Sequence, residues 1–267
     1  MNERFVFVGG GNMGRAMAAA LIAQKVCAAE EILVVEPHQE TRETLAGMGC
    51  RVLELADETI GQPQVVVVAV KPQSAQDVFA QIKPWLQPHQ VLVSIMAGVT
   101  LGALVEGLGS HAVVRVMPNT PAQIGMGMNV YYAPPELNGN KLGQVEALLN
   151  ASGSALCVAS EDAIDAATAV SGSGPAYVFY LAENWMAQAE ALGFTTEEAR
   201  TLVQQTLLGA TELWKGQTES AGTLRERVTS KGGTTAAALE HFEGKGIGQA
   251  LREGIQKAYQ RAKELGR

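Results

Sequence analysis

The first half of the chain alternates short apolar runs with amphipathic stretches. Five runs rich in Val and Ile are apolar on both faces, which is typical of buried parallel strands; they span residues 4–9, 32–35, 65–70, 91–95 and 112–117. Helical stretches such as 12–24 and 73–82 lie between them, so strands and helices alternate. The pattern predicts a doubly wound α/β domain of the Rossmann type over residues 1–158, to which residues 129–132 would add an edge strand.

After Val158 the strand-like runs stop and helical patterns take over. Pro175 suits the first turn of a helix, and Thr195 with Glu198 forms a capping box for the next one. The expected helices span residues 175–193, 195–215, 234–242 and 246–264. Residues 159–267 are therefore predicted to form an all-α domain.

The helix that begins at Pro175 carries apolar side chains nearly all round. They are Val178, Phe179, Leu181, Ala182, Trp185, Met186, Ala189 and Leu192. A helix that is apolar on every side is buried on every side, and a domain of about 110 residues offers few such places. We therefore expect a second copy of the chain to cover it, which makes the all-α half a dimerisation domain.

Composition narrows the classes of function. A net charge of −7 argues against a nucleic-acid partner. No apolar run reaches the ~18 residues of a membrane span, and the first residues lead straight into a strand without the pattern of a signal peptide. Cys27, Cys50 and Cys157 lack metal-ligand spacing and are interpreted as buried, reduced thiols. These features favour a cytoplasmic protein with no metal and no membrane partner.

A glycine motif follows the first predicted strand. Residues 9–14, GGGNMG, fit G-x-G-x-x-G between a strand and a helix, which is the pattern of a dinucleotide-binding loop. Gly9 permits the tight turn, Gly11 lets the backbone approach a pyrophosphate, and Gly14 lets the helix pack on the strand. The pyrophosphate would bind the helix N-terminus. A glycine-rich turn without a ligand is the alternative.

Glu36 ends the second predicted strand, 22 residues after Gly14. A carboxylate at this place accepts hydrogen bonds from ribose hydroxyls and repels a 2′-phosphate, which favours NAD over NADP. His38 and Arg42 would instead meet a phosphate if the loop turned, and a solvated loop carboxylate is a further alternative. The choice between NADH and NADPH stays open.

Three more strand ends carry loop signals at the same edge of the predicted sheet. Ligands of open α/β sheets bind outside the carboxyl ends of the strands, so these loops would line the cofactor groove. Their residues are Ala69, Val70, Lys71 and Pro72, then Ala97, Gly98 and Val99, then Pro118, Asn119, Thr120 and Pro121. The prolines stiffen the loops, Asn119 offers hydrogen bonds, and Lys71 offers a positive charge. Turn formation alone is the alternative.

Residues 228–240, VTSKGGTTAAALE, place two glycines and four hydroxyls at a predicted helix start. Free backbone N–H groups and the helix dipole at such a place can hold a carboxylate. Gly232 and Gly233 remove the β-carbons that would block its approach. An ordinary capped helix start is the alternative, since Ser, Thr and Gly are also good caps.

Taken together, these motifs resemble those of pyrroline-5-carboxylate reductases. The resemblance covers the whole chain through GGGNMG, AVKP, AGV, MPNTP, SGSGPAY and VTSKGGTTAAALE. It implies an N-terminal Rossmann domain and a helical C-terminal domain that interlocks two subunits, in some members within larger rings. It also implies reduction of Δ1-pyrroline-5-carboxylate to L-proline, the last step of proline biosynthesis, with NADPH or NADH.

The resemblance implies roles for single residues as well. The substrate carboxylate would bind at Ser230, Gly232, Gly233 and Thr234. Thr235, the expected catalytic residue, would lie beside the substrate nitrogen, and Glu161 would lie near the ring. The cofactor loop would be Val8, Gly9, Gly10, Gly11, Asn12 and Met13. Lys231 stands where several members have proline, and Glu36 followed by Pro37 differs from the phosphate-binding loop of NADPH-preferring members.

A β-hydroxyacid dehydrogenase is the main alternative. Such enzymes share the Rossmann start and a helical second domain, but they rely on a catalytic lysine on a helix of that domain. The lysines after residue 160 are Lys215, Lys231, Lys245, Lys257 and Lys263, and none stands in a hydroxy-acid signature. A non-enzymatic dinucleotide-binding dimer is a second alternative, which would need the first glycine motif but not the second.

Overall fold

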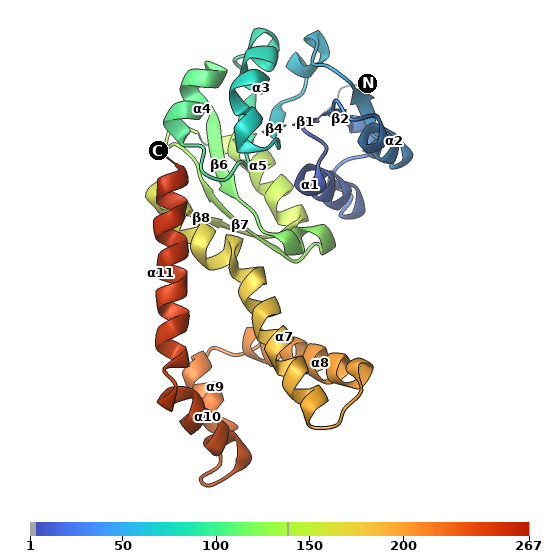
Figure 1. Cartoon of the computed structure of the whole chain (residues 1–267). Coiled ribbons are helices and arrows are strands. Elements are labelled where there is room, and N and C mark those ends of the chain that lie inside the picture. Colours follow the sequence, from blue (N-terminus) through green and yellow to red (C-terminus); the bar gives the residue numbers. More distant parts are fainter. Residues whose placement is uncertain (1–3, 138, 267) are drawn as a thin grey trace. The chain divides into compact units, whose positions relative to one another are not determined.

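The computed structural model describes residues 4–137 and 139–266, which form two compact units. The first unit takes the described residues up to Pro175 together with those from Ala258 onward, and the second is Ala176–Lys257. Figure 1 shows the elements in chain order. The end of the last helix therefore belongs to the first unit, although it follows the second in sequence.

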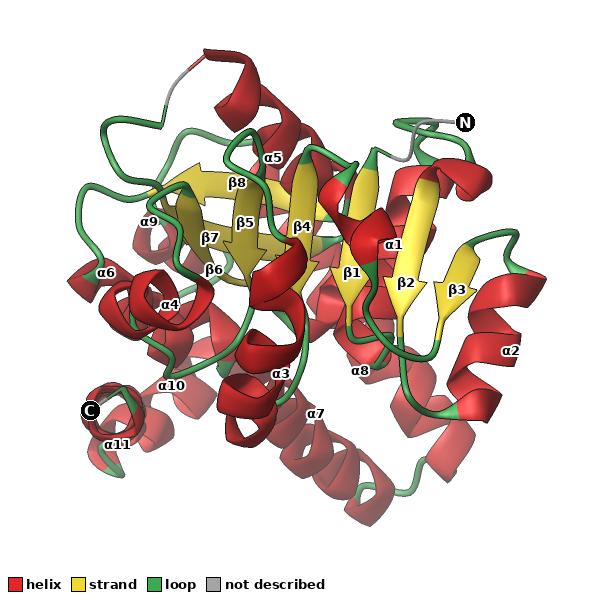
Figure 2. Ribbon diagram, turned by 90° about the horizontal axis from the view of Figure 1, so that it is seen from above, coloured by secondary structure: helices red, strands yellow, loops and turns green. Residues whose placement is uncertain are grey.

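The first unit is built on one eight-stranded sheet with the order β3-β2-β1-β4-β5-β6-β7-β8 (Figure 2). The strands are β1 Phe5–Val8, β2 Ile32–Val35, β3 Arg51–Leu53, β4 Val65–Val68, β5 Val91–Ser94, β6 Val113–Met117, β7 Gly127–Tyr132 and β8 Gly153–Cys157. Neighbouring strands are parallel except β6 and β7. The chain order reverses between β1 and β4, which is the place where doubly wound folds bind ligands. The predicted α/β fold is confirmed.

Successive side chains of the central strands enter two separate apolar cores, as a sheet covered on both faces requires. On one face Phe5 and Phe7 pack with residues of α1 (Asn12–Ala23), α2 (Gln39–Gly47) and α5 (Gly139–Ala151). On the other face Val6 and Val8 pack with residues of α3 (Ala75–Ile82) and α4 (Leu101–Leu108). The helices therefore cover both faces of the sheet, and because β1, β4 and β5 are parallel, their carboxyl ends lie at the same edge.

Short helical turns complete the first unit. They are η1 Ala29–Glu31, η2 Glu58–Gly61, η3 Pro72–Ser74, η4 Lys83–Trp85 and η5 Thr120–Ile124. After β8 the chain forms α6 (Asp162–Ala167), which continues as a π-helical segment, η6 (Thr168–Gly172). Such wide turns often mark functional places in helices.

The strands β3 and β8 were not predicted, and one strand that was predicted at the edge of the sheet lies inside it. The sequence predicts an edge strand over 129–132, but β7 is second from the edge because β8 pairs with it. The β8 sequence, GSALC, and the three residues of β3 lack a continuous apolar run, so the pattern misses both. Cys157 is exposed on β8, which corrects the interpretation of all three thiols as buried.

The other two cysteines agree with that interpretation. Cys27 and Cys50 are buried, and all three thiols are free. Burial raises the pKa of the Cys50 thiol to about 11 and also raises the pKa of Cys27. Both thiols therefore stay protonated near neutral pH and behave as small apolar side chains.

The second unit consists of helices and turns in its described residues. The helices are α7 Gly174–Ala191, which starts in the first unit, α8 Thr196–Lys215, α9 Ala221–Arg227, α10 Thr234–Gly244 and α11 Ile247–Leu265, which ends there. The predicted capping box is present: Thr195 Oγ1 accepts from the Glu198 N–H at 3.3 Å, and Glu198 Oε2 accepts from the Thr195 N–H at 2.8 Å. Only α9 was not expected, because seven residues give too short a pattern.

The apolar side chains of α7 are left in water by a single chain. Phe179 is 68% exposed and Leu181 is 54% exposed, and Ala189 is the buried residue of this helix. Exposed apolar surface of this extent marks an association surface. The arrangement agrees with the expectation that a second copy covers α7.

None of the described helices is long and apolar enough to cross a bilayer. Among residues 4–137 and 139–266, no group of three or more His, Cys, Asp or Glu side chains is placed to hold a metal ion.

Candidate active site

The glycine loop between β1 and α1 admits no side chain at two of its positions. Gly9 has a φ of +102°, and a Cβ there would lie 2.8 Å from the carbonyl oxygen of Ala69. A Cβ at Gly14 would collide with the carbonyl oxygen of Gly9. At Gly11, by contrast, a Cβ would have no described atom within 4 Å, and no side chain caps the helix that starts beyond it. Open space over an uncapped helix N-terminus fits a pyrophosphate.

A cavity of about 340 Å³ opens at the carboxyl ends of β1, β4 and β5. It is lined by Gly11, Asn12, Met13, Ala69, Val70, Lys71, Pro72, Ile95, Met96 and Ala97. The structure therefore brings together the glycine loop and two of the three further loops that the sequence places at this edge, those after β4 and β5, whereas residues 118–121 are not part of the lining. Ile95 and Met96 were not predicted, although the apolar run that forms β5 continues through both of them. Apolar walls with one lysine suit a cofactor that carries both rings and phosphates.

The other predicted cofactor residues lie outside the lining of this cavity. They are Val8, Gly9, Gly10, Gly14, Glu36, Gly98, Asn119, Thr120 and Pro121. Asn119 has partners in the protein: its Nδ2 donates to the Ser171 carbonyl at 3.0 Å, and its Oδ1 accepts from the Met128 N–H at 2.8 Å. Asn119 thus ties β7 to η6, and its contact with a cofactor stays a prediction.

Glu36 braces two loops against each other. Its side chain is 5% exposed, its Oε2 accepts from the Gly10 N–H at 2.8 Å, and its Oε1 accepts from the His38 N–H at 2.9 Å. Arg42 folds onto the same loop, where it donates to the carbonyls of Glu36 and Pro37 at 2.9 and 2.6 Å. The carboxylate is therefore fixed beside the glycine loop, and the guanidinium is engaged.

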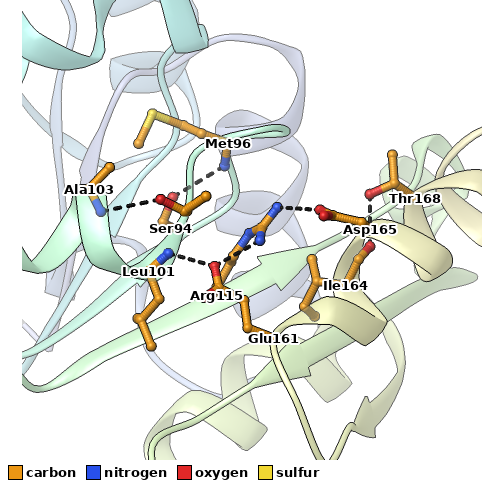
Figure 3. A network of polar contacts seen from close by, with 10 residues as sticks. Ser94, Met96, Leu101, Ala103, Arg115, Glu161, Ile164, Asp165 and Thr168 are labelled. Carbon is orange, nitrogen blue, oxygen red and sulfur yellow. Dashed lines mark hydrogen bonds and ion pairs between the residues drawn. The ribbon is translucent and has the colours of Figure 1, made fainter. Parts of the chain in front are cut away.

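Glu161 belongs to a buried ion-pair network (Figure 3). Arg115, on β6, is 2% exposed and donates through Nη1 to Glu161 Oε1 at 2.8 Å and through Nη2 to Asp165 Oδ1 at 2.8 Å. The same Glu161 oxygen accepts from the Leu101 N–H at 2.6 Å, at the start of α4. We call these residues the Arg115 network. The role of Glu161 beside a substrate ring stays a prediction, and the carboxylate has structural partners already.

The second glycine motif forms a turn before α10. Gly232 has a φ of +72°, and Gly233 is the N-cap residue, with an extended backbone. A Cβ on Gly233 would collide with the hydroxyl oxygen of Ser230. The backbone conformation therefore favours glycine at Gly232, whereas a side chain at position 233 would only require the Ser230 hydroxyl to turn away.

No side chain caps the start of α10, although hydroxyl groups surround it. Other helices of the same unit are capped: Thr195 caps α8, and Ser220 caps α9 through the Thr223 N–H at 3.1 Å. The hydroxyl of Thr229 instead donates to the Arg225 carbonyl at 2.6 Å. Gly233 is itself the N-cap residue, so the first N–H groups of α10 have no side-chain partner, and an ordinary glycine-capped start stays the alternative. The backbone N–H groups of this turn suit an anionic ligand.

Two family models match the two halves of the chain. Residues 161–265 match the model described as pyrroline-5-carboxylate reductase dimerisation. Residues 4–98 match the model described as NADP oxidoreductase, coenzyme F420-dependent. The first match shows that the helical half associates with a second copy, and the second agrees with a dinucleotide cavity in the first unit.

Curated relatives match over almost their full length. A pyrroline-5-carboxylate reductase of Pseudomonas aeruginosa is 40% identical over 98% of this chain and 96% of its own. One from Synechocystis is 37% identical over 100% of both chains.

Solved structures agree with these relatives. The structure of a pyrroline-5-carboxylate reductase from Coxiella burnetii is 32% identical, covers 100% of both chains and has a TM-score of 0.92. A Plasmodium falciparum pyrroline carboxylate reductase with NADP bound is 29% identical, with a TM-score of 0.88 over 100% of this chain and 99% of its own. The chain therefore belongs to the pyrroline-5-carboxylate reductase family.

Proposed function

We propose that the chain reduces Δ1-pyrroline-5-carboxylate to L-proline with NADPH or NADH, the last step of proline biosynthesis. The observation that carries the proposal is the full-length similarity to reductases of this name, at up to 40% identity, in a chain that holds both glycine sites. No relative reported above favours the β-hydroxyacid dehydrogenase. A dinucleotide-binding dimer without activity would not need the glycine turn before α10.

The cavity of the first unit is the proposed dinucleotide site. The open space at Gly11 and the uncapped N-terminus of α1 support it, because both fit a pyrophosphate. The bound dinucleotide would supply the hydride. The proposed cofactor residues are Val8, Gly9, Gly10, Gly11, Asn12, Met13, Gly14, Glu36, Ala69, Val70, Lys71, Pro72, Ala97, Gly98, Asn119, Thr120 and Pro121.

The turn before α10 is the proposed anchor of the substrate carboxylate. Its backbone N–H groups, with the hydroxyls of Ser230 and Thr234, would fix the anion and so orient the C=N bond. Thr235 would hold the ring nitrogen. Because a neutral threonine is a poor acid, its hydroxyl more reasonably orients a substrate that binds protonated or relays a proton from water. Glu161 is the further residue that the resemblance places near the ring.

The domains of the chain are proposed as 1–158 for the dinucleotide and 159–267 for dimerisation and substrate. The start of the dimerisation model at residue 161 supports this division. Residues 1–3, 138 and 267 lie outside the described part of the chain. We also propose a cytoplasmic location, which three free thiols suit. The ring of dimers that the resemblance implies for some members stays an expectation.

The test is oxidation of NADPH and of NADH, followed by absorbance, with purified protein and pyrroline-5-carboxylate. We expect oxidation that depends on the imine. The parallel control is 3-hydroxyisobutyrate with NAD or NADP, on which we expect no turnover. Activity on the hydroxy acid alone would support the dehydrogenase, and cofactor binding without turnover on either compound would support the non-enzymatic dimer.

Glu36 is expected to disfavour the 2′-phosphate of NADPH. Its carboxylate is fixed beside the glycine loop, and Arg42 reaches a phosphate only by giving up its carbonyl partners. Glu36→Gln should therefore lower the ratio of kcat/KM for NADH over NADPH by about five- to twentyfold. The measurement is a set of initial rates with each cofactor at saturating imine.

The matched control is Glu40→Gln. Glu40 lies exposed in the first turn of α2, so this change removes the same charge from the same region without touching the glycine loop. We expect it to change the ratio by less than about twofold, since exposed charges are screened. An equal change in both variants would show that general charge, not the position of Glu36, sets the preference.

A further inference from the structure

We propose that Glu161 and the C-terminal end of α11 are positioning residues of the dinucleotide cavity. Both hold the segment between β5 and α4, residues 95–100, in the shape that lines the cavity. The proposal rests on the proposed dinucleotide binding and does not depend on which imine is reduced.

The segment between β5 and α4 forms one wall of the cavity. Ile95, Met96 and Ala97 line it directly. Gly98 then has a φ of +74°, so the backbone turns immediately after the wall. The side chain of Thr100 caps α4 by accepting from the Ala103 N–H at 3.3 Å. The position of the wall is therefore set by the turn at Gly98 and by the place where α4 starts.

Glu161 fixes the start of α4 from 60 residues further along the chain. Its Oε1 accepts from the Leu101 N–H at 2.6 Å, a charge-assisted hydrogen bond of the strong kind. The same oxygen is held by Arg115, whose side chain is 2% exposed and rooted in β6 (Figure 3). Because both of its partners belong to the sheet and its covering helix, Glu161 connects the wall to the rigid part of the first unit.

The end of α11 supports the turn itself. The position of a Cβ on Gly98 lies 3.0 Å from the Leu265 carbonyl oxygen and 3.1 Å from the Leu265 Cβ. A Cβ on Gly266 would lie 3.7 Å from the Gly98 carbonyl oxygen and 3.8 Å from Thr100 Cγ2. The chain end therefore packs on the outer side of the turn and leaves no room for a side chain at Gly98. Two contacts therefore hold the wall in place: the end of α11 packs on Gly98, and Glu161 accepts a hydrogen bond from the Leu101 N–H.

Asp165 separates this role from a purely structural one. It pairs with the same guanidinium as Glu161, at the same distance of 2.8 Å, but the Leu101 N–H goes to Glu161. Loss of either carboxylate removes one ion pair from Arg115. Only the loss of Glu161 also removes the hydrogen bond to the Leu101 N–H at the start of α4. A displacement of about 1 Å in a wall that touches the cofactor is enough to weaken its binding and alignment.

The experiment measures the Kd of NADH and of NADPH by titration of the full-length protein, together with the KM for the imine. We expect Glu161→Ala to raise the dinucleotide Kd by about five- to twentyfold and Asp165→Ala by less than about twofold. Glu161→Gln keeps an oxygen for the Leu101 N–H and should restore the Kd to within about threefold of the unchanged protein. Thermal unfolding of each variant checks that it is folded.

A second pair of variants tests the contact between the end of α11 and Gly98 independently. Deletion of residues 265–267 removes the contact with Gly98, and we expect the dinucleotide Kd to rise by about three- to tenfold. Leu265→Ala keeps the backbone carbonyl and the Cβ that meet the turn, so it should leave the Kd within about twofold.

Either of two results would overturn the proposal. One is an equal rise in Kd for Glu161→Ala and Asp165→Ala, which would make the network a matter of stability alone. The other is a raised KM for the imine with an unchanged dinucleotide Kd, which would return Glu161 to the substrate ring. Dinucleotide binding that responds as expected, in a protein without turnover on the imine, would count against the proposed function only.

Discussion

Replacing Thr235 with alanine should lower kcat for imine reduction by about ten- to a thousandfold, the cost of one or two oriented polar contacts at the reacting nitrogen. The structure places Thr235 one residue inside the uncapped start of α10, next to the backbone groups proposed to hold the substrate carboxylate. Thr235 therefore follows directly after Thr234, the last residue of the proposed carboxylate anchor. The dinucleotide Kd should stay within about twofold, because Thr235 is not among the proposed cofactor residues.

Thr229 provides the matched control for this prediction. It lies in the same turn, but its hydroxyl already donates to the Arg225 carbonyl at 2.6 Å. Thr229→Ala should therefore change kcat by less than about twofold, and Thr235→Ser should recover most of the lost turnover because it keeps the hydroxyl. Equal losses in Thr229→Ala and Thr235→Ala would point to the fold of the turn instead of the chemistry of one hydroxyl.

The central strands could be predicted because they are buried on both faces. Such strands consist of short apolar runs rich in Val, and residues 65–68 are four valines in a row. The edge strand β8 was missed because Gly153 and Ser154 interrupt the apolar pattern, and three of its five residues, Ser154, Leu156 and Cys157, are exposed to solvent. Its absence from the prediction also placed β7 wrongly at the edge.

Most residues that line the cavity were among those predicted, because they come directly after strands. A parallel sheet brings the carboxyl ends of its strands to one edge, so a sequence position is enough to place Ala69 or Ala97 there. The partners of Glu161 and Asn119 could not be found in this way. Glu161 meets Arg115 across 46 residues and Asn119 meets Ser171 across 52. Such pairings depend on how α6 and η6 lie on the sheet, and no periodicity in the sequence records that.

The second large effect that we expect is a loss of stability when Arg115 is replaced. Its side chain is 2% exposed and stands between two carboxylates that are 29% and 15% exposed. Arg115→Met would leave Glu161 and Asp165 side by side without a cation, and removing one partner from a buried ionic group costs about 3–5 kcal/mol. We expect a loss of this size in the free energy of unfolding, measured in urea at a fixed protein concentration because the protein associates.

A variant in which all three charged residues of the network are replaced by neutral ones distinguishes two contributions to stability. One is the net contribution of the ion pairs, and the other is the penalty of leaving a carboxylate without its cation. A variant with Arg115→Met, Glu161→Gln and Asp165→Asn has no charge left to strand, and the amide oxygen introduced by Glu161→Gln still accepts from the Leu101 N–H. Replacing buried ionic groups together is often close to neutral, so we expect the triple variant to regain most of the lost stability. A triple variant as unstable as Arg115→Met would mean that the guanidinium contributes through packing between β6 and α6. In that case the carboxylates, Glu161 included, would not need the cation to stay in place, and the hold on α4 would depend on the Leu101 N–H alone.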